Sequence, residues 1–292
     1  MGYDYRKCVS QINEFAAANP DAGVFSIGES VMEQKLYCIS YGKGERKLFL
    51  NGSHHGLEYI TSAFLMQFLR EYARCLKDGE PMLGYDARAL YNGVTLYVVP
   101  MVNPDGVDIA VNGLDITNVY HRRLISMVGI HSFNRVWQAN ANGVDINHNY
   151  DAHWSVVEKS PAPSKYSGPY AESEPETRAV TGFVRSQDFD MLMAFHSQGG
   201  EIYYDFDGMA AHRDLEAAER MSRESGYPVC TPEGSAAFGG CKDWFIREFG
   251  RGGFTIEMGR GKNPLPEEML EEIYEENAKI VLSAMSELCE RT

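Results

Sequence analysis

The sequence predicts an α/β fold in which helices pack against a mostly buried sheet. Short apolar runs bounded by Gly, Asn or Pro recur along the chain, which is typical of strands buried in a sheet. Helical patterns lie between several of these runs, and such alternation indicates an α/β domain. The 292 residues, 44% of them hydrophobic, are enough for one large core. We therefore expect a single domain over residues 1–292.

In chain order, the apolar runs predict strands at residues 35–40, 47–51, 95–101, 191–196 and 254–258. Apolar side chains at helical spacing predict helices at residues 59–76, 175–186, 215–225 and 266–289. The tract between residues 102 and 175 has no comparable pattern. Because long irregular connections inside a compact domain usually carry function, we expect this tract to contribute to a site.

The net charge of the chain argues against a nucleic-acid partner. The chain has 27 basic and 41 acidic residues, for a net charge of −14, whereas nucleic-acid binding needs a basic surface. No apolar stretch reaches the about 20 residues that cross a bilayer, and the N-terminus lacks the features of a secretory signal. The six cysteines are scattered and are expected to be free thiols. We expect a cytoplasmic protein without a nucleic-acid, membrane or protein partner.

A histidine and a glutamate follow the second predicted strand. His55 and Glu58 are three residues apart at the expected start of a helix, so both side chains can face one point. An imidazole nitrogen and a carboxylate are suitable zinc ligands, and a catalytic zinc site needs one more protein ligand and an open position for water. Taken alone, this spacing is more often an ordinary surface or capping feature.

Two further polar residues lie in or at the end of predicted strands. His196 ends an apolar run before a Gly-Gly pair, which delivers it to the carboxyl edge of the sheet, where α/β folds bind ligands. A lone histidine there is more often a core residue. Glu257 lies within an apolar run, where a carboxylate is costly unless it is paired or functional. Beside a metal it can take a proton from water. Together these residues predict one zinc ion bound by His55, Glu58 and His196, with Glu257 as general base.

Combined, these motifs resemble the zinc metallocarboxypeptidase family over residues 35–261. The matching segments are His55-Gly-Leu-Glu58, Asn103-Pro-Asp-Gly106, Gly143-Val-Asp-Ile-Asn-His-Asn149, His196-Ser-Gln198 and Phe254-Thr-Ile-Glu257, in the order of the family. The resemblance implies a three-layer α/β/α sandwich on a mixed sheet of roughly eight strands. It supports the same three ligands and the same base.

Three departures from the family pattern concern the substrate. Members that act as ordinary carboxypeptidases grip the terminal carboxylate with an Arg in an Asn-Arg pair, which here is Asn147-His148. Their oxyanion-stabilising Arg after a Trp is replaced by Gln138, and residues 233–238 lack their capping Tyr. Because a guanidinium binds a carboxylate better than an amide or imidazole does, ordinary carboxypeptidase activity is in doubt. We expect Gln138, Asn147 and His148 to contact the substrate, with His148 alternatively supporting a ligand, and Asp145 to orient His55.

Lys242 lies where the family forms the pocket for the residue after the scissile bond; the alternative is a surface lysine at a helix start. With the segments Trp137-Gln-Ala-Asn140 and Lys242-Asp-Trp-Phe245, the chain resembles the bacterial subgroup that cleaves γ-D-glutamyl-diaminopimelate bonds. Diaminopimelate would offer a distal carboxylate to Lys242, which implies a small peptide or muropeptide substrate.

Two alternatives to this substrate remain open. One is a carboxypeptidase acting on ordinary peptides, which would be favoured if Arg122 or Arg123 supplied the missing charge. The other belongs to a different class: a cell-wall-peptide-binding protein with little turnover. An intact Glu257 argues against a pure binder, since binding needs no base.

Overall fold

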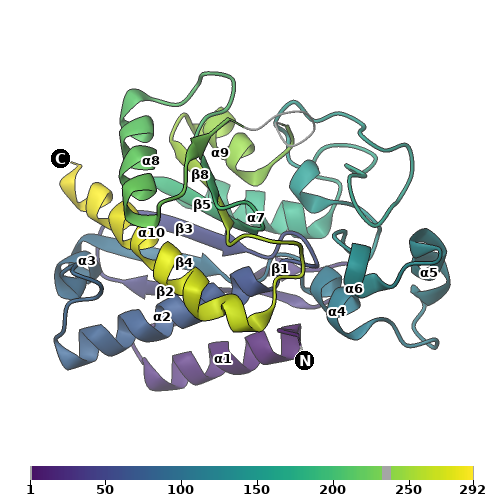
Figure 1. The fold of residues 1–292 in the computed structure, drawn as a ribbon, viewed down its shortest axis with the longest axis horizontal. Coiled ribbons are helices and arrows are strands. Elements are labelled where there is room, and N and C mark those ends of the chain that lie inside the picture. The colour runs from purple at the N-terminus through teal and green to yellow at the C-terminus, as the bar shows by residue number, and fades with distance from the viewer. Residues whose placement is uncertain (1, 232–237, 292) are drawn as a thin grey trace.

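The computed structural model describes residues 2–231 and 238–291, and one eight-stranded mixed sheet forms the centre of this part (Figure 1). The strand order is β1-β2-β4-β3-β5-β8-β6-β7. The strands are β1 (Gly23–Glu29), β2 (Lys35–Gly42), β3 (Arg46–Gly52), β4 (Val94–Val99), β5 (Met191–Ser197), β6 (Glu201–Tyr203), β7 (Val229–Cys230) and β8 (Gly252–Met258).

The four central strands, β4, β3, β5 and β8, run parallel to one another. On one flank, β1 pairs antiparallel with β2, and β2 pairs antiparallel with β4. On the other flank, β6 pairs antiparallel with β8 and parallel with β7. All seven residues of β5 are buried, as expected for a parallel strand covered on both faces. The carboxyl ends of the central strands meet at one edge, which is where α/β folds place their ligand sites.

Helices cover both faces of the sheet, and Figure 1 shows α1 and α2 on the opposite side from α7 and α9. The first core is formed with α1 (Tyr5–Ala18), α2 (Ile60–Asp78), α3 (Ala87–Gly93), α8 (His212–Ser225) and α10 (Leu270–Glu290). The second is formed with α7 (Pro175–Ser186) and α9 (Cys241–Phe249). The predicted three-layer α/β/α arrangement on a mixed sheet is confirmed.

Side-chain alternation along the strands decides which face carries the polar residues. In β5, Met193 joins the first core and Ala194 the second, so His196 faces the side of α7 and α9. In β8, Phe254 and Ile256 belong to the first core, which turns Glu257 to the same side as His196.

The predicted strands are confirmed, with ends that differ by one or two residues. Of the predicted helices, α7 matches at both ends, α2 and α8 differ by a few residues, and α10 is preceded by a 3₁₀ turn (Glu267–Met269). Several elements carried too little signal to be predicted. β1 is an edge strand without a fully buried residue, and α1 buries only Cys8, Ile12 and Phe15. In the part of the chain that the structure describes, no helix has the length and apolarity to cross a membrane.

The tract between residues 102 and 175 contains helices but no strand. It includes α4 (Pro104–Asn112), α5 (His121–Val128), α6 (Phe133–Val136) and a 3₁₀ turn (Ile146–His148). Its start is held to the segment after β3, because the N–H of Asn103 donates to the carbonyl of Ser53 at 3.0 Å. The Asn103 side chain also caps α4 by accepting from the N–H of Gly106 at 2.9 Å. The tract therefore lies against the carboxyl edge of the sheet.

Candidate metal centre

Three side chains meet at the carboxyl edge of β3 and β5. His55 and Glu58 lie on the connection from β3 to α2, and His196 is the penultimate residue of β5. One candidate ligand atom from each lies within 4.8 Å of the other two. The register places Gly52 beside Phe195, so the chain leaving β3 passes next to His196. Parallel strand pairing thus brings the third ligand to the first two.

The burial and hydrogen bonding of these three side chains favour a bound cation. Glu58 and His196 are 5% and 2% exposed, and Nδ1 of His196 lies 3.1 Å from Oε2 of Glu58. Nε2 of His196 is buried and has no hydrogen-bond partner among the described residues. A buried carboxylate and an unpartnered buried nitrogen are costly unless a ligand satisfies them. Nitrogen and oxygen donors in this combination fit zinc.

Asp145 supports His55, as expected from the sequence. Its Oδ1 lies 3.3 Å from Nδ1 of His55. Burial lowers the pKa of His55, but the charges of Asp145 and Glu58 outweigh it and raise that pKa to about 10. Burial raises the pKa of Asp145, but the charges of His55 and His148 hold it below its usual range. Without metal the pocket therefore favours a positive charge at His55, and a bound zinc ion supplies such a charge instead.

Glu257 stands next to the third ligand across the sheet. It is the register partner of His196 between the parallel strands β5 and β8. Burial raises the pKa of Glu257 well above its usual value, the charge of Glu58 raises it further, and His55 lowers it. A carboxyl group with a raised pKa is suited to accept and release a proton near neutral pH.

Two of the residues predicted to bind substrate lie close to the ligands. Oε1 of Gln138 accepts from the backbone N–H of Leu57, between the first two ligands, at 3.3 Å. Nε2 of His148 is 4.0 Å from Oδ2 of Asp145, so one carboxylate lies between this imidazole and that of His55. Both side chains are partly exposed, which leaves them able to reach a bound molecule.

Of the other two residues predicted to bind substrate, Lys242 lies in the first turn of α9 and Asn147 contacts the start of that helix. Oδ1 of Asn147 accepts from the N–H of Cys241 at 3.2 Å, which holds the 3₁₀ turn to this helix. Lys242 is only 3% exposed, so it is not a surface lysine. Its ammonium donates to the carbonyl of Asp205 at 2.6 Å and forms an ion pair with Asp243. An ammonium has three donors, and these two partners account for two of them.

An ordinary carboxypeptidase would need an arginine from the preceding loop and a capping tyrosine. The guanidinium of Arg123 donates to the backbone carbonyl of Asn142 at 2.7 Å, and Arg122 is exposed. Of residues 233–238, the segment that lacks the capping tyrosine, residues 233–237 lie outside the described residues.

Two residues that contact the metal ligands were not predicted to do so from the sequence. His54 is buried, its Nε2 lies 2.8 Å from the Tyr150 hydroxyl, and its ring stacks on His196 with centroids 5.4 Å apart. Asn263 comes from the loop after β8, and its Nδ2 donates to Oε1 of Glu58 at 3.1 Å. Neither position belongs to a periodic pattern, so only the folded chain identifies them.

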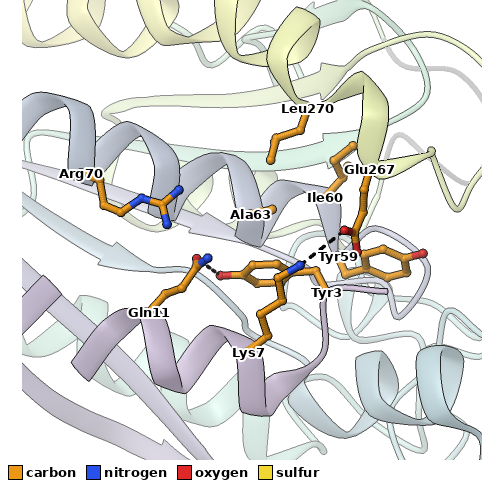
Figure 2. A pocket seen from close by; sticks show the side chains of 9 residues that line it. All are labelled: Tyr3, Lys7, Gln11, Tyr59, Ile60, Ala63, Arg70, Glu267 and Leu270. Carbon is orange, nitrogen blue, oxygen red and sulfur yellow. Dashed lines mark hydrogen bonds and ion pairs between the residues drawn. The ribbon is translucent and has the colours of Figure 1, made fainter. Parts of the chain in front are cut away.

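A separate small pocket lies between α1, the start of α2 and the 3₁₀ turn before α10 (Figure 2). Its volume is about 80 Å³, and none of the three metal ligands lines it. Inside it the Tyr3 hydroxyl donates to Gln11 at 2.7 Å, and Lys7 pairs with Glu267 at 3.4 Å. These polar groups therefore already pair with one another, and the pocket is distinct from the metal centre.

Known proteins share this architecture. A model of the zinc carboxypeptidase family matches residues 8–280. The chain is 35% identical over 290 residues to gamma-D-glutamyl-L-diamino acid endopeptidase 1 of Lysinibacillus sphaericus, covering 98% of this chain and 72% of that protein. It is 31% identical over 292 residues to the uncharacterized protein YqgT of Bacillus subtilis (strain 168), covering 97% of this chain and 77% of the relative.

Among solved structures, bovine thrombin-activatable fibrinolysis inhibitor in complex with tick carboxypeptidase inhibitor superposes with a TM-score of 0.78. The sequence identity is 20%, and the match covers 100% of this chain and 99% of that one, which shows a common fold. The family model spans most of the chain and includes all three metal ligands. The chain therefore belongs to the zinc carboxypeptidase family and is a zinc metallopeptidase with His55, Glu58 and His196 as its zinc ligands.

Proposed function

We propose that this peptidase hydrolyses the amide bond between γ-D-glutamate and diaminopimelate in small peptides of the bacterial cell wall. The observation that carries the proposal is the buried ammonium of Lys242, which has one donor left beyond Asp205 and Asp243. The similarity to an endopeptidase named for γ-D-glutamyl-L-diamino acid substrates supports the same substrate class.

The position of Lys242 relative to the base supports this role. A Cβ added to Gly253 would lie 3.3 Å from Cγ of Lys242, so the lysine stem packs directly on β8 at this glycine. Gly253, Thr255 and Glu257 alternate with the first-core residues and share one face of the strand. Lys242 thus approaches the sheet on the face that carries Glu257. A substrate bound beside Glu257 could place a distal carboxylate against this ammonium.

The chemistry follows from the arrangement around Glu257. Zinc bound by the three ligands would supply Lewis acidity and would lower the pKa of water. Glu257 accepts a proton from the attacking water and passes it to the leaving amine nitrogen. The amide oxygen of Gln138 accepts from Leu57, so the donor end of the same amide is left for the substrate carbonyl oxygen.

Mass spectrometry of the zinc-loaded protein tests the proposal. The protein is incubated separately with L-Ala-γ-D-Glu-diaminopimelate and with a blocked L-dipeptide, and Glu257→Gln serves as the control. We expect release of diaminopimelate from the tripeptide by the wild type alone. Cleavage of only the dipeptide would instead make the chain a carboxypeptidase of ordinary peptides. Zinc binding with no cleavage of either would favour the cell-wall-peptide-binding protein. The cytoplasmic compartment expected from the sequence stays a prediction.

A further inference from the structure

Both oxygens of the Glu58 carboxylate are held by groups of the protein. Oε2 lies 3.1 Å from Nδ1 of His196 and accepts from the backbone N–H of Ser197 at 3.2 Å. Oε1 accepts from Nδ2 of Asn263 at 3.1 Å. Asn263 lies 205 residues beyond Glu58 in the chain, in the loop between β8 and α10. This loop therefore reaches back to the metal centre through one side chain.

Hydrogen bonds with Ser197 orient the Asn263 side-chain amide, and a hydrogen bond to Gln198 holds the Asn263 backbone. The Ser197 hydroxyl donates to Oδ1 of Asn263 at 2.7 Å, and Nδ2 of Asn263 donates to the Ser197 carbonyl at 3.2 Å. The backbone N–H of Asn263 donates to Oε1 of Gln198 at 2.7 Å. If the amide were flipped, its oxygen would face the Glu58 carboxylate and the Ser197 carbonyl, which are both acceptors. Only the observed orientation gives a donor to both of these acceptors.

We infer that Asn263 is a positioning residue that holds the Glu58 carboxylate in the orientation zinc requires, and that Ser197 keeps its amide turned for this task. The terminal torsion of a glutamate is broad, so an untethered carboxylate samples many orientations. A hydrogen bond to one oxygen removes that freedom before the metal arrives. Partners of this kind typically contribute about 10- to 100-fold to metal affinity.

The neutrality of Asn263 suits this position. A lysine or arginine would hold the carboxylate more tightly, but its positive charge would repel a divalent cation at close range. An amide donates a hydrogen bond to Glu58 and leaves the negative charge of the ligand for zinc. The inference concerns the metal centre alone, so it stands or falls independently of the proposed substrate.

Zinc affinity measured without any substrate tests the inference. The variants are Asn263→Ala, Ser197→Ala and the double variant, with Lys262→Ala as matched control, because Lys262 is an exposed neighbour in the same loop. Zinc dissociation constants come from competition with a chromophoric chelator. For Asn263→Ala we expect a constant about 10- to 100-fold higher than that of the wild type. Ser197→Ala should weaken binding less, the double variant no more than Asn263→Ala alone, and Lys262→Ala not at all.

Two spectroscopic measurements separate positioning from general support of the fold. The visible spectrum of the cobalt-substituted protein reports ligand geometry, and we expect it to change in Asn263→Ala and Ser197→Ala but not in Lys262→Ala. Circular dichroism of the metal-free proteins should be the same for all. Unchanged zinc affinity and cobalt spectrum in Asn263→Ala would overturn the inference, as would a loss in affinity that follows a loss of helix content. If Asn263→Ala does not fold, Ser197→Ala decides by the same criteria.

Discussion

His196 and Glu257 are register partners on the neighbouring parallel strands β5 and β8, and their side chains emerge on the same face of the sheet. On the other side of Glu257, Glu201 of β6 is its antiparallel partner. A ligand, the expected base and a second carboxylate therefore form a row across three strands. The effects of replacing Glu257 and its neighbour Glu201 can therefore be compared directly.

Replacement of Glu257 by Gln should lower kcat by about 10²- to 10⁴-fold, because the water loses its proton acceptor. Zinc content should stay at the wild-type level, since Glu257 is not one of the three ligands. Glu201→Gln is the matched control, and its kcat should fall far less than that of Glu257→Gln, although the charge of Glu201 also raises the pKa of Glu257. Turnover of the tripeptide and metal analysis of both variants check this. A Glu257→Gln enzyme with wild-type kcat would rule out this glutamate as the base.

Removal of the metal should abolish hydrolysis and lower thermal stability. A ligand present at about 1,000 times its Kd stabilises the folded state by about 4 kcal/mol, so excess zinc should raise Tm clearly. Dialysis against a chelator, followed by addition of zinc, should remove and restore both properties in the wild type. His196→Ala should show neither recovery, because one of the three ligands is missing. Full recovery in that variant would mean that zinc binds elsewhere.

A tripeptide with lysine in place of diaminopimelate should be a poorer substrate, because lysine lacks the distal carboxylate offered to Lys242. Loss of one charge-assisted hydrogen bond, about 1.5–3 kcal/mol, corresponds to a kcat/KM lower by roughly 10- to 100-fold. The double variant Lys242→Met/Asp243→Asn avoids leaving the buried Asp243 unpaired and should cleave both peptides equally. Equal cleavage of both peptides by the wild type would remove Lys242 from substrate recognition.

Glu176 should make the stability depend on pH. It is fully buried, Oε1 accepts from the N–H of Val31 at 3.1 Å, and Oε2 accepts from Nδ2 of Asn140 at 3.0 Å. Burial, with a smaller effect of Asp105, raises the pKa of Glu176 to about 8. The folded protein therefore keeps a proton that the unfolded chain releases above its ordinary pKa of 4.5.

The stabilisation linked to this proton is complete below about pH 4.5 and is lost as the pH rises towards 8, by at most about 1.4 kcal/mol per pH unit. Urea unfolding between pH 5 and 8 checks this. As the pH rises, the free energy of unfolding of the wild type should fall relative to that of Glu176→Gln. A difference that does not change with pH would show that Glu176 is ionised in the folded protein.

Much of the fold was predictable because its signals are local. A buried parallel strand such as β5 is an unbroken apolar run, and α2 and α7 have apolar side chains at helical spacing. The same reasoning missed α9, whose nine residues give little periodicity, and β7, which has two residues. Such short elements are stabilised mainly by their neighbours, so their own residues indicate them weakly.

The sequence by itself determined the zinc ligands and the location of Glu257, because His55 and Glu58 are local neighbours and the other two lie at strand ends, which parallel strands bring to one edge. Only the tertiary structure decided that Lys242 is buried with its ammonium on the carbonyl of Asp205 and that Asn263 holds Glu58. The physical reason is that both depend on packing between segments far apart in the chain. Residue type and spacing specify which side chains can bind a metal, whereas burial and orientation arise only when the elements pack together.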